Sequence, residues 1–250
     1  KIKQKIGEWV FFKLFFTFNF SKFLLERNYW VEAERTGPFI YKIIDSIGYI
    51  YYESFEDEIQ ESSLDLIIKK LRINNDDTIK GVIFDIRGNS GGNIENAFKL
   101  LRRMGIDTNF ATTIIPYKVI YKNGPAKDDI SDPQTAFIEQ SDKTKFPKNF
   151  ILLTNRQVQG AATLFTSGAN SYDNVTVYGD TTGGGVGRIV GTELSNGWKI
   201  SFPASKVLSG GGTDLGEGIA PDVQVEMDKT DEERGIDTIL EAALDALRNK

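Results

Sequence analysis

The sequence predicts an α/β protein with a largely parallel sheet, and three observations support this prediction. Short apolar runs, typical of strands buried on both faces, occur at residues 81–86, 150–154 and 175–178. The first two runs each lead through a polar or glycine-rich turn into a helical pattern of apolar residues. Strands that alternate with helices usually form a parallel sheet with the helices packed on its faces.

The first half of the chain opens with an aromatic stretch whose structure the pattern leaves open. Between Phe11 and Phe20 the apolar residues fit both a helical stripe and a strand alternation. Residues 47–55 are rich in aromatic and branched side chains, which favours a strand. Ser63 is predicted to cap a helix that ends near Leu71. A further helical pattern, after the strand at 81–86, includes Ala97, Leu100, Leu101 and Met104.

The second half repeats the order of strand, turn and helix and then adds a hairpin. Residues 125–133 contain two prolines and are interpreted as a loop. The strand at 150–154 is followed by a predicted helix over residues 160–169. The Asn-Gly pair at 196–197 lies between two strand-like segments, which is a strong hairpin signal. An amphipathic helix is predicted over residues 236–247.

The composition excludes several kinds of chemistry. The 250 residues carry 30 Lys and Arg against 35 Asp and Glu, with a net charge of −5 and no basic run, which argues against a nucleic-acid partner. The chain has no Cys and no His, so it lacks thiolate nucleophiles, Cys-ligated zinc and the commonest general base. Its acidic pairs lack the spacing of a calcium loop. We therefore expect neither a metal nor a cofactor.

The chain is predicted to consist of an aromatic N-terminal segment, residues 1–45, and a core domain, residues 46–250. The segment could be the remnant of a larger N-terminal domain. Its apolar stretch from Trp9 to Leu25 contains two lysines and is shorter than the roughly 20 apolar residues that a membrane span needs. No transmembrane span is expected. A signal or anchor segment could have been removed, so export remains open.

Two turns between a strand and a helix are candidates for chemistry. In the Gly88–Gly92 loop, the free N–H groups at a helix start could hold an anion or a developing oxyanion. Its spacing fits neither a P-loop nor a dinucleotide fingerprint, and the pattern leaves a plain tight turn equally open. The second turn, Thr154–Ala162, has Gly160 where a nucleophile often stands, and from the residues alone it is only a helix start.

Several sequence blocks occur together in a fixed order. They are Ile47-Gly-Tyr-Ile50, Ser54-Phe55, Gly81-Val-Ile-Phe-Asp-Ile-Arg-Gly-Asn-Ser-Gly-Gly92, Leu153-Thr-Asn-Arg-Gln-Val-Gln-Gly-Ala-Ala162, Gly179-Asp-Thr-Thr-Gly-Gly-Gly185, Glu193-Leu-Ser-Asn-Gly-Trp198 and Gly218-Ile-Ala-Pro-Asp222. Over about residues 40–248 the chain resembles the C-terminal processing, or tail-specific, serine peptidases, which include the tricorn core and the retinoid-binding-protein-like members. The resemblance implies a ClpP/crotonase-like core of repeated ββα units and an ancestry in peptide-bond hydrolysis. It also implies an exported, often lipid-anchored protein of the bacterial envelope, with a cytoplasmic location as the alternative.

The resemblance also implies the site residues. Gly160 occupies the position of the family's Ser nucleophile. The oxyanion amides would be those of Gly91 or Gly92 and of Ala161. The acidic residue that orients the family's base falls near Glu217. Backbone N–H groups do not depend on side-chain identity, so they could still receive a carbonyl oxygen or a C-terminal carboxylate.

The catalytic base of the family has no counterpart in this sequence. Members with a Ser–Lys dyad carry the Lys in register with Gly185, and members with the Thr-Gly-Gly-Gly turn use a His upstream of the core. Ser90, Ser167 and Thr163 lie near the turn in sequence, but a hydroxyl without a base is a weak nucleophile. The chain as written is therefore predicted not to cleave peptides.

Three functions remain open at this stage. The first is a serine peptidase inactivated by truncation or by an engineered Gly160. The second is a natural pseudopeptidase that binds extended peptides as a module. The third is an acyl-transfer or hydratase enzyme, which rests on fold analogy. The expected partner is a polypeptide or a peptide C-terminus, and the substrate sequence and the oligomeric state stay open.

Overall fold

The computed structural model describes residues 25–71, 79–104, 117–124, 126, 128–136, 141–146 and 149–249. The ambiguous aromatic stretch Phe11–Phe20 lies outside the described residues, as does part of the predicted loop at 125–133. Among the described residues, no helix is long and apolar enough to cross a membrane.

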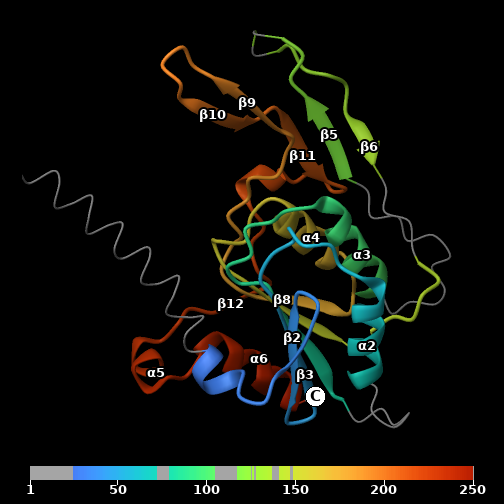
Figure 1. Cartoon of the computed structure of the whole chain (residues 1–250), viewed down its shortest axis with the longest axis vertical. Coiled ribbons are helices and arrows are strands. Elements are labelled where there is room, and N and C mark those ends of the chain that lie inside the picture. Colours follow the sequence, from blue (N-terminus) through green and yellow to red (C-terminus); the bar gives the residue numbers. More distant parts are fainter. Residues whose placement is uncertain are drawn as a thin grey trace, which may run out of the picture.

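A seven-stranded sheet forms the centre of the molecule (Figure 1). In spatial order its strands are β1 (Glu34–Thr36), β2 (Phe39–Ile44), β3 (Ile47–Tyr52), β4 (Gly81–Asp85), β7 (Phe150–Thr154), β8 (Val175–Gly179) and β12 (Val223–Gln224). The first three strands pair antiparallel, and from β3 to β12 every neighbouring pair is parallel. All residues of β4 and β7 are buried, as their continuous apolar runs predict. The predicted α/β class with a largely parallel sheet is confirmed.

Helices cover both faces of this sheet (Figure 1). On one face lie α2 (Glu61–Leu71), α3 (Ile94–Met104) and α4 (Ala161–Ala169), whose apolar residues share one core cluster with Val82 and Phe84 of β4. On the other face, Ile83 packs with the C-terminal helix α6 (Thr238–Arg248) and with Leu25 of η1 (Leu25–Tyr29). The alternation of side chains along β4 therefore supplies both halves of the core.

Two smaller sheets extend from the body of the protein. One consists of β5 (Tyr117–Tyr121), β6 (Gln134–Ala136) and β11 (Ser205–Ser209) in the order β11-β5-β6. The other is the predicted hairpin, formed by β9 (Ile189–Glu193) and β10 (Lys199–Pro203), which stands out from the body in Figure 1. The Asn196 Oδ1 accepts the Trp198 N–H at 3.1 Å, and Gly197 adopts a positive φ of 83°, so the Asn-Gly pair does form the turn. Trp198, beside that turn, is 71% exposed.

The start of the core differs from the sequence prediction in one detail. Helix α2 begins at Glu61, so Ser63 lies inside its first turn and is not the N-cap. Ser63 is buried against Gly37, whose positive φ of 52° brings the chain back toward the helix. Strands β1 and β2, from the predicted N-terminal segment, pair into the main sheet beside β3. The division of the chain at residue 45 stays a prediction.

Candidate functional site

Three turns meet at one edge of the sheet because they follow three neighbouring parallel strands. The loop 86–93 leaves β4, the turn 155–160 leaves β7 and the turn 180–185 leaves β8. The carboxyl ends of adjacent parallel strands lie at the same edge, which is where α/β proteins usually bind ligands. The two turns that the sequence indicates as candidates are therefore brought together, and the third is added to them.

The loop 86–93 is held in place by its own asparagine and by the segment after β3. The side chain of Asn89 is fully buried, accepts the Gly91 N–H at 2.9 Å and donates to the Tyr52 carbonyl at 3.0 Å. Phe55 donates its N–H to the Gly91 carbonyl at 2.9 Å and accepts the Asn93 N–H at 2.9 Å. Gly91 and Gly92 adopt positive φ angles of 95° and 134°, which other residues rarely adopt.

The turn 155–160 lies directly against this loop. Gln159 donates its N–H to the Asn89 carbonyl at 3.1 Å. A Cβ built on Gly91 would lie 2.6 Å from the Gln159 oxygen and 3.0 Å from the Ala161 nitrogen, so only glycine permits this approach. Gly160 is the N-cap of α4, with φ 55° and ψ −122° and no side-chain cap bond. A Cβ on Gly160 would meet nothing closer than the Ser90 carbonyl oxygen at 3.7 Å.

The turn 180–185 supports Gly160 from the opposite side. The Gly184 carbonyl accepts the Gly160 N–H at 2.9 Å, and Gly183 donates its N–H to the Val158 carbonyl at 2.7 Å. The buried hydroxyl of Thr163 lies 3.1 Å from both carbonyl oxygens, to which it can donate. These contacts hold the start of α4 between two glycine turns.

Of the three candidate oxyanion amides, those of Gly92 and Ala161 remain for a ligand. In the described part of the chain, neither the Gly92 N–H nor the Ala161 N–H donates a hydrogen bond to the protein. The Gly91 N–H is already bound to Asn89, so it is not available. Ala161 begins α4, where the aligned peptide dipoles add partial positive charge. We call this place, formed by Gly92, Gly160 and Ala161, the amide cradle.

The predicted acidic residue does not lie inside the cradle. Glu217 ends the short helix η3 (Leu215–Glu217) and is exposed, and within the described residues its carboxylate accepts no hydrogen bond. The neighbouring Asp214 caps η3 through the Gly216 N–H at 3.0 Å and pairs with Lys206 at 2.8 Å. Helix η3 contacts the neighbouring turn 180–185 through the backbone, where Gly185 donates its N–H to the Gly216 carbonyl at 3.3 Å, and Leu215 is buried in the same core cluster as Ala161.

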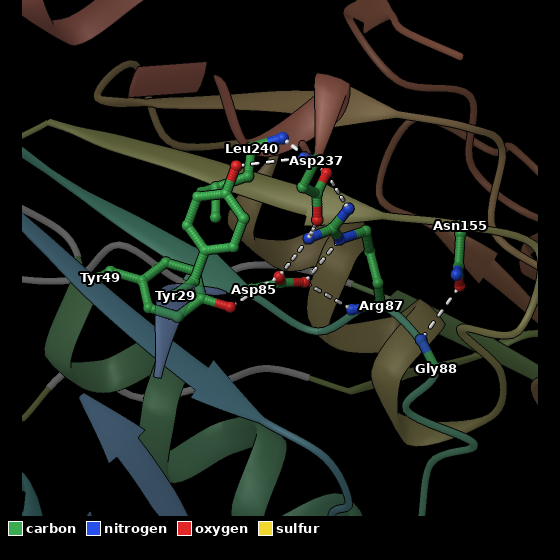
Figure 2. Close-up of polar contacts among 8 residues, drawn as sticks. All are labelled: Tyr29, Tyr49, Asp85, Arg87, Gly88, Asn155, Asp237 and Leu240. Carbon is green, nitrogen blue, oxygen red and sulfur yellow. Dashed lines mark hydrogen bonds and ion pairs between the residues drawn. The ribbon is translucent and has the colours of Figure 1, made fainter. Parts of the chain in front are cut away.

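A buried ion network anchors the start of the loop 86–93 (Figure 2). The Arg87 guanidinium donates to Asp85 through Nε at 3.0 Å and Nη2 at 2.7 Å. It also donates to Asp237 through Nη1 at 2.9 Å and Nη2 at 2.7 Å. Tyr49 donates its hydroxyl to Asp85 at 3.0 Å. The exposed fractions are 7% for Arg87, 0% for Asp85 and 2% for Asp237.

Charge compensation keeps Asp237 of this network ionised. Burial by itself would raise the pKa of Asp237, but the charge and hydrogen bonds of Arg87 and the N–H groups of α6 hold that pKa below its usual value. Burial and the nearby charge of Asp85 raise the pKa of Tyr49, which keeps its phenol a donor. Asp237 is also the N-cap of α6 and accepts the Leu240 N–H at 3.0 Å. The network therefore links the loop 86–93 to the C-terminal helix.

Sequence reasoning missed this network because its members are far apart in the chain. Asp237 lies 150 positions from Arg87. The only local signal is an Asp that ends a buried strand two residues before an Arg. Across the described ranges, no three acidic side chains are grouped as a metal site would require.

The lowered pKa of Asp237 predicts how the free energy of unfolding depends on pH. The carboxylate stabilises the fold fully above the ordinary Asp pKa of about 3.9, and this contribution is lost as the pH falls through the lower folded-state value. Replacing Asp237 with Asn is expected to lower the unfolding free energy at pH 7 by about 2 kcal/mol and to flatten its fall below about pH 5. Urea unfolding from pH 3 to 7 measures both effects.

The exposed Asp173→Asn variant controls for the loss of one negative charge. If Asp237→Asn loses stability in acid as steeply as the unchanged protein, Asp237 is not the group responsible.

The fold and its edge turns define a class of protein: an α/β protein in which a glycine loop meets a helix start at the carboxyl edge of a mainly parallel sheet. The profile of peptidase family S41 matches residues 46–225, and the chain belongs to this family. The predicted relationship to C-terminal processing peptidases is confirmed.

Individual relatives show the same relationship. The Probable CtpA-like serine protease of Staphylococcus aureus (strain COL) is 25% identical over 191 residues, which make up 76% of this chain and 35% of that protein. The chain thus spans about a third of this relative's length. A crystal structure of a protein from Parabacteroides merdae ATCC 43184 is 33% identical, with a TM-score of 0.81, over 89% of this chain and 69% of that one. The photosystem II D1 C-terminal processing protease, 15% identical with a TM-score of 0.55 over 78% and 51% of the two chains, shares the fold.

Proposed function

We propose that this member of peptidase family S41 binds extended polypeptide at the amide cradle and, as the chain is written, does not cleave it. The observation that carries the proposal is Gly160. The resemblance assigns it the position of the family's nucleophile; it is the N-cap of α4, and it has no side chain. A natural pseudopeptidase and an engineered or substrate-trapping form of a peptidase both fit this observation.

The chemistry of acyl transfer explains why Gly160 decides the activity. A serine peptidase needs a hydroxyl oxygen beside a base, and losing the nucleophile alone costs about a millionfold in turnover. The buried Thr163 hydroxyl cannot replace it, because the Val158 and Gly184 carbonyls and the Thr182 hydroxyl surround it as hydrogen-bond partners. The chain contains no His that could act as the base.

Binding does not require the missing side chain. The Gly92 and Ala161 N–H groups are unpaired within the described residues, and the helix start supplies partial positive charge. Two such donors suit one carbonyl oxygen of an extended chain or one oxygen of a C-terminal carboxylate. The proposed partner is therefore a polypeptide, with its C-terminus as the favoured point of attachment. The exported, envelope location implied by the family also stays a proposal.

The experiment compares Gly160→Ser with Gly160→Ala in the chain together with any sequence that its gene encodes upstream of Lys1. Both side chains fit the space, but the positive φ of 55° should cost each about 1–3 kcal/mol of unfolding free energy. Only the Ser variant is expected to degrade unfolded casein, and only it should be labelled by a fluorophosphonate. The unchanged chain should bind an unstructured peptide with a free C-terminal carboxylate and leave it intact.

Cleavage by the unchanged chain would contradict the proposed loss of activity. Failure of the unchanged chain to bind the peptide would contradict the binding role. An inactive Ser variant that is folded and still binds peptide would argue against Gly160 as the position of a former nucleophile. The Ala variant controls for backbone strain, since it carries the same Cβ without the hydroxyl.

A further inference from the structure

Asn155 joins the two halves of the amide cradle through a single side-chain atom. It directly follows β7 and is half-buried. Its Oδ1 accepts the Gly88 N–H at 3.1 Å and the Gln157 N–H at 3.1 Å. Gly88 belongs to the loop after β4, 67 positions away, whereas Gln157 belongs to Asn155's own turn. Figure 2 shows Asn155 reaching across to Gly88.

The orientation of this amide follows from its partners. Both groups that face it are backbone N–H donors, so the atom between them must be the acceptor oxygen and not the NH2 group. The Asn155 main-chain carbonyl in addition accepts the Val158 N–H at 2.9 Å. One residue thus shapes the turn 155–158 and fixes its distance from the neighbouring loop.

A second tie between the same two segments lies one residue further along the loop. The Asn89 carbonyl accepts the Gln159 N–H at 3.1 Å. The segments are therefore joined at Gly88 with Asn155 and at Asn89 with Gln159, and the chain then continues on each side to a free amide. Those amides are Gly92 on the loop and Ala161 at the start of α4. Because two hydrogen bonds join the segments, the loop 86–93 cannot rotate about either one alone.

We propose that Asn155 is a positioning residue of the cradle, whose side-chain oxygen aligns the Gly92 and Ala161 N–H groups on one ligand oxygen. This inference rests on the proposed function, since the ligand is the polypeptide bound there. Without the Oδ1 acceptor, the half-buried Gly88 N–H has no partner and only the Asn89–Gln159 bond joins the two segments. On this proposal the Gly92 and Ala161 N–H groups then lose their common alignment, and the ligand oxygen keeps one donor in place of two.

The test uses Asn155→Ala and Asn155→Asp in the full chain, with Asn174→Ala as the matched control. Asn174 also joins separate segments, by donating to the Met104 carbonyl at 3.1 Å, but it lies at the start of β8, at the opposite end of the strand from the cradle. The probes are an eight-residue fluorescent peptide with a free C-terminal carboxylate and the same peptide with an amidated C-terminus. Fluorescence anisotropy gives the Kd of each.

Asn155→Ala is expected to weaken the binding of both peptides by about tenfold or more, because a donor is lost from the ligand oxygen. Asn155→Asp keeps an acceptor oxygen and adds a negative charge. It should therefore bind the amidated peptide like the unchanged chain but bind the carboxylate peptide several-fold more weakly. Asn174→Ala should change neither affinity. The difference between the two peptide ends in Asn155→Asp tests whether residue 155 lies near the bound terminus, and recovery of amidated-peptide binding relative to Asn155→Ala tests the role of the acceptor oxygen.

Two results would overturn the inference: unchanged affinities in a folded Asn155→Ala variant, or an equal loss in Asn174→Ala. A measurement that needs no ligand can test this inference even if the proposed function is wrong. Hydrogen exchange of the Gly88 N–H is expected to accelerate in Asn155→Ala and to stay slow in Asn155→Asp. If the unchanged chain binds neither peptide, the proposed function fails. In that case the exchange rates still decide whether Asn155 holds the two segments together, and equal rates in all variants would refute it.

Discussion

Replacing Arg87 with Met is expected to lower the free energy of unfolding by about 3–5 kcal/mol, the largest effect that we expect from one side chain. The change removes the cation that lies between Asp85 and Asp237, both of which are buried. Two carboxylates then face each other without compensation in a site that excludes water. Urea unfolding at pH 7, followed by far-UV circular dichroism, measures the loss.

Two controls show whether the uncompensated charge is the cause. Arg156 pairs with Asp180 at 3.0 Å, but its side chain is 74% exposed, so Arg156→Met should cost less than about 1 kcal/mol. Adding Asp85→Asn and Asp237→Asn to Arg87→Met should restore much of the lost stability, because no buried charge then remains in the network. A loss under 1 kcal/mol for Arg87→Met would show that this network does not anchor the loop 86–93.

Replacing Gly92 with Ala is expected to have the second largest effect and to weaken ligand binding. The new Cβ would lie 2.4 Å from the Phe55 carbonyl carbon and 2.5 Å from the Glu56 nitrogen, closer than real Cβ contacts allow. The loop must then move away from Phe55 and break the backbone bonds on either side of Gly92. Strain and the lost hydrogen bonds together should cost about 2–4 kcal/mol. Peptide affinity should fall by at least about tenfold, because the Gly92 N–H moves with the loop.

Gly197→Ala is the matched control for this change. Gly197 has a similarly positive φ of 83°, but a Cβ there would have no neighbour within 4 Å. It should therefore cost only the conformational strain of about 1–2 kcal/mol and leave peptide affinity unchanged. If Gly92→Ala binds peptide as well as Gly197→Ala does, the Gly92 amide is not part of the binding site.

The main sheet could be predicted largely from local pattern. The runs at 81–86 and 150–154 are apolar at nearly every position, which is typical of a strand covered on both faces, and β4 and β7 are buried throughout. The run at 175–178 does form a strand, but the expectation that it is buried on both faces was wrong, because β8 alternates buried and half-buried residues. The hairpin at 196–197 was also predictable, because its glycine adopts the positive φ that the turn demands. In contrast, β5, β6 and β11 were missed. The residues of β5 and β11 are mostly half-buried, Gln134 and Thr135 of β6 are exposed, and none of the three segments shows a clear strand or helix period.

The resemblance assigns Gly91 or Gly92, Gly160 and Ala161 to one site, and their functional roles stay a proposal. The structure brings the segments that carry these residues together. Which of the amides are hydrogen-bonded within the described residues could not be predicted from the sequence. The sequence left Gly91 and Gly92 as equal candidates for the oxyanion amide. That choice depends on a hydrogen bond from Gly91 to Asn89, which forms only when the loop folds back on itself.

The sequence by itself determined the alternation of the central strands β4 and β7 with helices, the absence of His and Cys, and the presence of a glycine at position 160. These are properties of local pattern and residue identity, and they do not depend on where the chain folds. Only the tertiary structure decided that Arg87 meets Asp237 across 150 positions, that Asn155 reaches Gly88, and that the Gly92 and Ala161 amides remain unpaired within the described residues. Each of these depends on distances between segments far apart in the chain, which are set by the pairing of parallel strands.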